Sequence, residues 1–182
     1  MKNYFVIHAL GRTAEDYWYS SIKEWATTSG YNCYTPTLPP MDNMSYSTWA
    51  AEFDKYSKFL NKDSVVIGHS TGCIFLVKYL MEHNIKVAKY ISVVGFNRAM
   101  ENSPHPDWDN INKSFFVTNL AGFKKYAKQR ISFYSPTDLY DFKILDDFAT
   151  TIDAQKVIIK NAGHFTSATG YDKEFPELIK YL

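Results

Sequence analysis

Short apolar runs alternate with amphipathic stretches along the whole 182-residue chain. The apolar runs have the length and side-chain content of buried strands, and the stretches between them repeat apolar residues at helical spacing. The predicted strands are Tyr4–Ala9, Tyr31–Thr35, Ser64–Gly68, Tyr90–Phe96, Ile131–Ser135 and Val157–Lys160. The predicted helices are Ala14–Thr28, Ser47–Leu60, Thr71–His83, Leu120–Gln129, Phe142–Thr150 and Lys173–Tyr181. This alternation predicts an α/β fold with about six parallel strands and helices on both faces.

Two proline-rich segments interrupt the pattern just after predicted strands. Residues 36–41 follow the second strand, and residues 97–112 form a longer stretch that contains Pro104 and Pro106. Proline disfavours helix and strand interiors, so both segments are predicted to be irregular. The longer one either overhangs a site at that edge of the sheet or is a solvated excursion. No composition shift or repeat divides the chain, and residues 1–182 are expected to form one domain.

Charge and composition exclude several classes of partner. The chain carries 20 Lys and Arg against 19 Asp and Glu, and no basic block stands out, so no nucleic-acid partner is expected. No run approaches the ~18 apolar residues of a membrane span, and the apolar start is too short for a signal peptide. A cytoplasmic protein without a membrane partner is expected. Cys33 and Cys73 fit neither a disulfide framework nor a metal site and are expected to be buried apolar residues.

The stretch Gly68-His69-Ser70-Thr71-Gly72 lies where a predicted strand passes into a predicted helix. A serine at such a turn is exposed at the edge of the sheet, and the flanking glycines allow a turn that a Cβ would obstruct. Ser70 is therefore the candidate nucleophile, provided that a base lies within reach. His69 is expected to turn its side chain away from Ser70.

A histidine and a carboxylate follow Ser70 in an informative order. His164 comes after the last predicted strand, in a loop at the carboxyl edge of the sheet, where α/β proteins place their sites. Asp138 comes directly after the fifth predicted strand and is the favoured partner for the imidazole. Asp141, three residues later, is the rival; its alternative role is that of a solvated aspartate at a helix start. The order Ser, Asp, His is that of a nucleophile-elbow hydrolase.

An acyl-transfer site also needs two backbone N–H groups for the oxyanion. Thr71 supplies one by its position, and the loop after the first strand supplies the other, with Leu10 favoured over its neighbour Ala9. Leu10, Trp18 and Phe96 are expected to line a shallow apolar cleft above Ser70 and to contact substrate, because each lies in or beside a loop at the carboxyl edge.

The full order of motifs resembles the α/β-hydrolase superfamily and, within it, the small serine hydrolases of the YdeN-like, retinoblastoma-binding protein nine-like group. The motifs that carry the resemblance are a short first strand ending in a His-containing loop, Tyr17-Trp18 opening the first helix, Thr35-Pro36-Thr37-Leu38-Pro39 before Trp49, the segment 68–72, the loop at Asp138 and Gly163-His164-Phe165. The resemblance implies a compact sheet that lacks the superfamily's first two strands and has the order 2-1-3-4-5-6. It also implies hydrolysis of esters or amides by Ser70, His164 and Asp138.

Two features depart from the family pattern. The usual His-Gly of the oxyanion loop is His8-Ala9, and the acid loop continues with Leu139-Tyr140-Asp141-Phe142 instead of a proline-containing segment. Neither cysteine lies in the Leu-x-Cys-x-Glu motif of the group's vertebrate namesake, so no retinoblastoma-type partner is expected.

These features predict a carboxylesterase-like serine hydrolase that acts on small or medium acyl substrates through an acyl-Ser70 intermediate. No cofactor and no metal are expected, and the sequence does not indicate an oligomeric state. Two alternatives stay open: a catalytically silent binding module with this fold, and an acyltransferase that uses an acceptor other than water.

Overall fold

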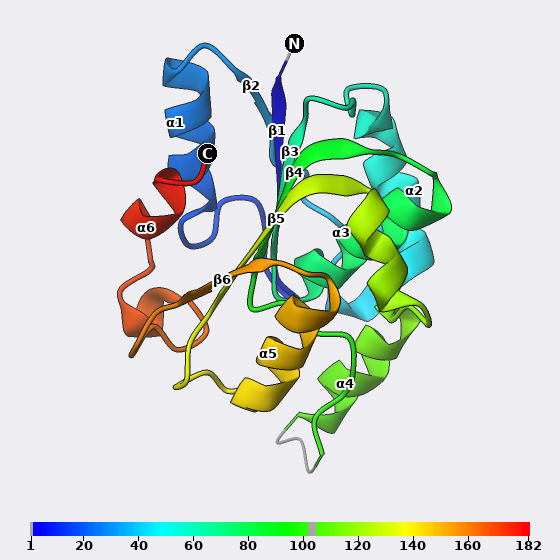
Figure 1. The fold of residues 1–182 in the computed structure, drawn as a ribbon, viewed down its shortest axis with the longest axis vertical. Helices are drawn as coiled ribbons and strands as arrows, with labels where there is room; N and C mark the ends of the chain where they lie inside the picture. The colour runs from blue at the N-terminus through cyan, green and yellow to red at the C-terminus, as the bar shows by residue number, and fades with distance from the viewer. Residues whose placement is uncertain (1, 102–104) are drawn as a thin grey trace.

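The structure is a computed structural model that describes residues 2–101 and 105–182. Its centre is a six-stranded parallel sheet in the order β2-β1-β3-β4-β5-β6 (Figure 1). The strands are β1 (Asn3–Ile7), β2 (Asn32–Tyr34), β3 (Val65–His69), β4 (Val87–Val93), β5 (Ala127–Tyr134) and β6 (Gln155–Ile158). The predicted fold class and strand order are confirmed.

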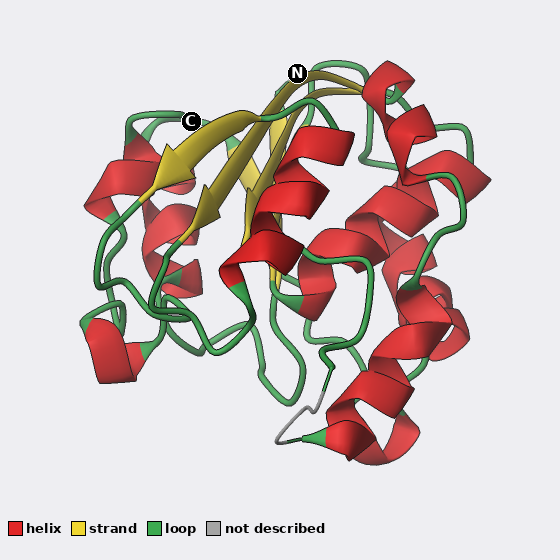
Figure 2. Cartoon of the chain, turned by 60° about the horizontal axis from the view of Figure 1, so that its bottom comes forward, coloured by secondary structure: helices red, strands yellow, loops and turns green. Residues whose placement is uncertain are grey.

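Helices cover both faces of the sheet, as the alternating pattern predicts (Figures 1 and 2). The α-helices are α1 (Tyr19–Thr28), α2 (Tyr46–Ser57), α3 (Thr71–Glu82), α4 (Pro106–Asn112), α5 (Phe142–Thr151) and α6 (Pro176–Ile179). Helices α1 and α6 bury aromatic and aliphatic side chains on one face, and α2 and α3 do so on the other. Each face of the sheet therefore has its own apolar core.

The strand register brings the carboxyl ends of four strands to one edge. Ile7 of β1 lies opposite Gly68 of β3, and His69 lies opposite Val93 of β4. Val93 in turn lies opposite Phe133 of β5. The loops that follow β1, β3 and β5 consequently leave the sheet at neighbouring positions, which places the predicted site residues in one region.

Two predicted helices differ from those observed. Helix α1 begins at Tyr19 and not at Ala14, because Tyr17 has a positive φ of 51°, which a right-handed helix does not contain. The predicted helix over residues 120–129 is wrong. That segment forms a short 3-10 helix, Leu120–Lys125, and then enters β5, whose Ala127 pairs with Val87. Strand pairing has overridden helical propensity here.

Prolines explain two further differences. The segment after Pro106, predicted to be irregular, is helix α4, with Pro106 at its first position, where a missing N–H is tolerated. Pro176 likewise begins α6, so the predicted helix from Lys173 starts late. Pro104 lies outside the described residues, so its part of the prediction stays untested.

Candidate active site

Ser70 lies in a strained turn between β3 and α3. Its φ of 54° and ψ of −121° are unusual for a residue with a side chain, and its backbone N–H donates to Val93 O at 2.8 Å. Both flanking glycines are needed for close approach. A Cβ on Gly68 would lie 2.6 Å from the backbone of Cys73, and one on Gly72 would lie 2.5 Å from Ile7 O. The sequence 68–72 thus folds as a strand-to-helix elbow packed against the end of β1.

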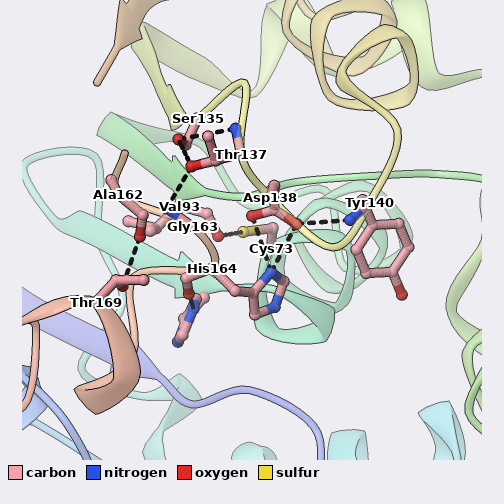
Figure 3. A network of polar contacts seen from close by, with 11 residues as sticks. Cys73, Val93, Ser135, Thr137, Asp138, Tyr140, Ala162, Gly163, His164 and Thr169 are labelled. Atoms are coloured by element: carbon pink, nitrogen blue, oxygen red, sulfur yellow. Dashed lines mark hydrogen bonds and ion pairs between the residues drawn. The ribbon is translucent and has the colours of Figure 1, made fainter. Parts of the chain in front are cut away.

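His164 and Asp138 face one another across the loops that follow β6 and β5 (Figure 3). The imidazole Nδ1 lies 3.0 Å from each Asp138 carboxylate oxygen, and since a carboxylate accepts, Nδ1–H is the donor. The Asp138 side chain is fully buried and that of His164 is 13% exposed. This pairing leaves Nε2 of His164 without a proton and able to accept one. Among the described residues no hydrogen bond joins Nε2 to Ser70 Oγ, and such contacts often tighten only when substrate binds.

Asp141 is placed differently from Asp138. It is the N-cap of α5, and its Oδ1 accepts a hydrogen bond from Lys143 N–H at 2.7 Å. The structure therefore brings Asp138 to the histidine and uses Asp141 to begin a helix, which was the alternative role considered for it. Asp138 also accepts from Tyr140 N–H at 2.8 Å, which orients its carboxylate.

The loop that carries His164 is tied to the acid loop. Gly163 N–H donates to Thr137 Oγ1 at 3.3 Å, and Thr169 Oγ1 donates to Ala162 O at 2.7 Å (Figure 3). Phe165 has a φ of 53°, a conformation that costs energy for a bulky residue and has to be held by its surroundings. The imidazole is thus presented by a constrained loop.

The structure distinguishes between the two candidates for the second oxyanion donor. Ala9 N–H already donates to the hydroxyl of Tyr19 at 3.2 Å, whereas Leu10 N–H makes no hydrogen bond in the described part of the chain. Thr71 N–H is also unpaired there, because it lies in the first turn of α3. Leu10 and Thr71 therefore offer two free backbone donors next to the elbow.

His8 fixes the start of this loop. Its Nε2 accepts from Leu38 N–H at 2.9 Å, so its Nδ1–H is the donor to Ala9 O at 2.8 Å. Although Ala9 stands where the family pattern has glycine, the His8 side chain holds the start of the loop through these two hydrogen bonds.

Two of the three residues expected to contact substrate offer no surface to it. Trp18 and Phe96 are both completely buried, whereas Leu10 is half-buried. The Trp18 side chain packs in the core, where its ring contacts that of Phe175 and its Nε1–H donates to Phe165 O at 3.2 Å. The Phe96 ring stacks on that of Tyr140 at 4.4 Å. Both residues pack behind the site. The prediction that Trp18 and Phe96 contact substrate is therefore corrected, because neither side chain reaches the surface.

The proline-rich excursion reaches the elbow. Asn112, in the last turn of α4, accepts a hydrogen bond from Thr71 Oγ1 at 2.7 Å. On the same helix Asp109 is buried, and neither of its carboxylate oxygens has a hydrogen-bond partner among the described residues. The segment after Pro106 thus overhangs the site and is not a solvated excursion.

Sequence reasoning did not identify Tyr19, Asn112 or Tyr140 as parts of this site. The Tyr140 ring lies nearly parallel to the His164 imidazole, with centroids 5.9 Å apart. A run of aromatic residues at 17–19 and a tyrosine two residues after the acid were the available signals, but neither reveals where a side chain points.

Among residues 2–101 and 105–182, no group of three or more His, Cys, Asp or Glu is arranged to hold a metal ion. No helix in the same ranges is long and apolar enough to cross a membrane.

Burial lowers the pKa of both His8 and His69, and that of His69 lies well below its usual value. The unfolded chain takes up a proton on each imidazole as the pH falls through about 6.5, whereas burial makes this uptake less favourable in the folded chain. The unfolded state then binds more protons, so stability should fall as the pH drops from 7 to 5. Each group contributes up to about 1.4 kcal/mol per pH unit. Urea unfolding at pH 7, 6 and 5 measures this effect.

The variant His69→Gln provides the control for this prediction. It removes the imidazole whose pKa is lowered most, so its free energy of unfolding should depend less on pH than that of the unaltered protein. Equal free energies of unfolding at pH 7 and pH 5 in the unaltered protein would contradict the prediction.

Comparison with known proteins adds to this geometry. The family described as serine hydrolase matches residues 4–182. No curated protein sequence matches the chain. Among solved structures, the ydeN gene product from B. subtilis has a TM-score of 0.88 and 20% identity, over 100% of this chain and 96% of its own.

Two more distant structures have the same fold. A protein described as a YdeN-like hydrolase from Pectobacterium atrosepticum has a TM-score of 0.68 and 15% identity, covering 99% of this chain and 88% of its own. A monoacylglycerol lipase from Paleococcus ferrophilus has a TM-score of 0.64 and 13% identity, covering 89% and 85%. At these identities the likeness establishes the α/β-hydrolase fold.

Proposed function

Since this chain belongs to the serine hydrolase family, we propose that Ser70, His164 and Asp138 form its catalytic triad and hydrolyse esters of small or medium acyl groups. The observation that carries the proposal is the His164–Asp138 pair, because it fixes the proton on Nδ1 and leaves Nε2 as a base. The backbone oxygen of His164 lies 2.9 Å from Nε2 of His69, the residue that precedes the strained Ser70. The ester class is supported by the lipase that shares the fold.

The proposed reaction has two acyl transfers. Ser70 Oγ attacks the ester carbonyl carbon while its proton passes to His164 Nε2, and the carbonyl oxygen becomes an oxyanion that accepts from Leu10 and Thr71 N–H. The intermediate collapses, the C–O bond to the alcohol breaks, and the alcohol leaves with the proton from Nε2. A water molecule then gives its proton to Nε2 and attacks acyl-Ser70. Collapse of the second intermediate releases the acid and returns the proton to Ser70 Oγ.

Asp138 does not take part in proton transfer in this scheme. Its carboxylate holds the imidazole in one tautomer and stabilises the imidazolium that forms at each step. The fully buried position of the Asp138 side chain strengthens this electrostatic effect, because little solvent screens the pair.

Reaction with a fluorophosphonate probe tests the proposal directly. The probe should label the protein at Ser70, located by mass spectrometry of the digested chain, and p-nitrophenyl acetate should be hydrolysed with an initial burst of p-nitrophenol. A protein that is folded but neither labelled nor active would favour a catalytically silent binding module. Labelling without release of free acid, together with acyl transfer to an added alcohol, would favour an acyltransferase.

The proposed path of the acyl group runs from Ser70 over the acid loop. A hollow of about 740 Å³ borders that loop; its lining includes Asp138 and the exposed apolar residues Leu139 and Phe142, but neither Ser70 nor His164. Charged side chains of Arg98 and Lys143 also line it, so a long chain would soon pass beyond apolar surface. Each buried CH₂ contributes about 0.8 kcal/mol, a gain that should stop after the first few carbons.

We expect p-nitrophenyl acetate and butyrate to be hydrolysed with a higher kcat/KM than the palmitate ester. The measurement is the initial rate across an acyl-chain series, with every ester below its micelle concentration. A steady rise in kcat/KM through the long chains would contradict the proposal of a short apolar surface and indicate a lipase-like tunnel.

A further inference from the structure

A chain of buried hydrogen bonds runs behind the elbow and links three loops of the site. Ala9 N–H donates to the Tyr19 hydroxyl at 3.2 Å, and this hydroxyl lies 2.5 Å from His69 Nδ1. On the other side of the same ring, His69 Nε2 lies 2.9 Å from His164 O. The chain therefore begins one residue before the Leu10 donor, passes through the neighbour of Ser70 and ends on the backbone of His164.

The direction of every hydrogen bond follows from donor and acceptor chemistry. A carbonyl only accepts, so His69 Nε2–H donates to His164 O. With a neutral ring, Nδ1 is then an acceptor for the Tyr19 O–H, whose oxygen is free to accept from Ala9 N–H. If the ring were charged, Nδ1–H would donate a hydrogen bond to the Tyr19 hydroxyl oxygen, and the hydroxyl proton of Tyr19 would have no acceptor. Only the neutral ring satisfies every group.

The surroundings favour the same state. His69 is completely buried and Tyr19 is 1% exposed. Aromatic rings of Tyr17, Trp18 and Tyr19 pack around the imidazole, within 6 Å of its centroid. The cationic Arg12 and the imidazole of His164 also disfavour a charge on His69. A neutral, fixed donor and acceptor is the state that this environment stabilises.

Tyr19 and His69 do not take part in the proposed chemistry, because both nitrogens of the ring are already occupied by Tyr19 and His164. Their partners, however, are the backbones that carry the oxyanion donor and the base. The base loop is held at a second point by the neighbour of Tyr19, since Trp18 Nε1–H donates to Phe165 O. Phe165 has a positive φ, so this loop needs such restraints.

We propose that Tyr19 and His69 are positioning residues, which hold the Leu10 N–H and the His164 imidazole in register with Ser70 through this one chain of hydrogen bonds. The inference rests on the proposed function. A displacement of about 1 Å between reacting groups lowers a rate by as much as ~100-fold, so loss of the chain should be visible in kcat.

Tyr19→Phe is the sharpest variant, because it removes one oxygen and keeps the ring. It leaves Ala9 N–H without an acceptor and His69 Nδ1 without a donor. We expect kcat for p-nitrophenyl acetate to fall by about 10- to 100-fold with little change in KM, because the altered groups do not touch substrate.

Tyr79→Phe is the matched control. Tyr79 is also completely buried, and its hydroxyl donates to Asp54 Oδ1 at 2.5 Å, on the part of α3 far from the elbow. Tyr79→Phe should lower Tm by about 2–4 °C through loss of one hydrogen bond, and Tyr19→Phe by about 4–8 °C through loss of two. Only Tyr19→Phe should slow the reaction. Equal kcat values in the two variants, with an active unaltered protein, would overturn the inference and leave the proposed function intact.

Substitution of His69 separates its two contacts. Glutamine can place an amide N–H near the position of Nε2 and keep the donor to His164 O, whereas leucine keeps neither contact. We expect kcat to decrease in the order unaltered protein, His69→Gln, His69→Leu. A leucine variant that folds and is as active as the glutamine variant would contradict the proposed role of the donor.

Nitrogen-15 NMR of the imidazoles tests the chain without any enzyme assay. His69 should carry its proton on Nε2, opposite to His8 and His164, and should keep it unchanged between about pH 5 and pH 8. A His69 ring that titrates in this range, or carries its proton on Nδ1, would overturn the inference. Because this signature does not require hydrolysis, it distinguishes failure of the chain from failure of the proposed function.

Discussion

Ser70→Ala should lower kcat by about 10⁴- to 10⁶-fold and abolish labelling by a fluorophosphonate probe. The reason is that the alanine methyl cannot form an acyl intermediate, so only the oxyanion donors and substrate binding would continue to assist attack by water. The change should not unfold the protein, because Ser70 Oγ makes no hydrogen bond among the described residues. Steady-state assays with p-nitrophenyl acetate measure the loss of kcat, and mass spectrometry of the probe-treated protein measures the loss of labelling.

Ser114→Ala is a suitable control for this experiment. The Ser114 hydroxyl accepts a hydrogen bond from Tyr46 N–H at the surface, and its loss should leave both labelling and kcat unchanged. Equal labelling of the unaltered protein and Ser70→Ala would show that another nucleophile reacts with the probe.

Asp138→Asn should lower kcat by about 10⁴-fold while the protein stays folded. An asparagine of the same shape can donate to Nδ1 through its amide, which shifts the imidazole proton to Nε2 and removes the base that Ser70 needs. The Asp138 side chain is fully buried, so solvent cannot substitute for its charge. The measurement is kcat at pH 7 to 8, together with imidazole NMR that reports the tautomer of His164.

Asp141→Asn controls for the loss of a nearby charge. Asparagine is as good an N-cap as aspartate, so α5 should begin as before and kcat should change by less than about twofold. A large loss of activity in Asp141→Asn with a small loss in Asp138→Asn would reverse the assignment of the acid.

Hydrophobic patterning predicted the centre of the sheet well because β1 and β3 are buried along their whole length, and burial demands a continuous apolar run. The run at 65–67 is one such strand, and it was found within one residue of its observed start. Patterning failed at residues 120–129, where Ala127 and its neighbours join β4 through long-range pairing that no local signal contains. It also failed before Tyr19, where the positive φ of Tyr17 prevents the helix from beginning earlier.

The chain order of Ser70, Asp138 and His164 could be predicted because these residues follow strand ends, and strand ends of a parallel sheet share an edge. The direction of a side chain could not. Trp18 lies in the loop before α1 at that edge, yet its ring is completely buried in the core. His69 was expected to point away from the nucleophile. The two residues that its ring contacts could not be predicted, because Tyr19 and His164 lie far from His69 in the sequence.

Helix α4 suggests how a relative of this protein could change its choice of substrate while keeping its chemistry. The reacting groups sit on strand ends fixed by the sheet register, whereas α4 belongs to the crossover between β4 and β5 and meets the elbow through Asn112. Its Asp109 is buried without a hydrogen-bond partner in the described chain, an arrangement that costs stability instead of adding it. Randomising residues 106–111 in a directed-evolution library, with Asn112 kept, would therefore explore new ester selectivities while the strand ends that carry the reacting groups stay in place.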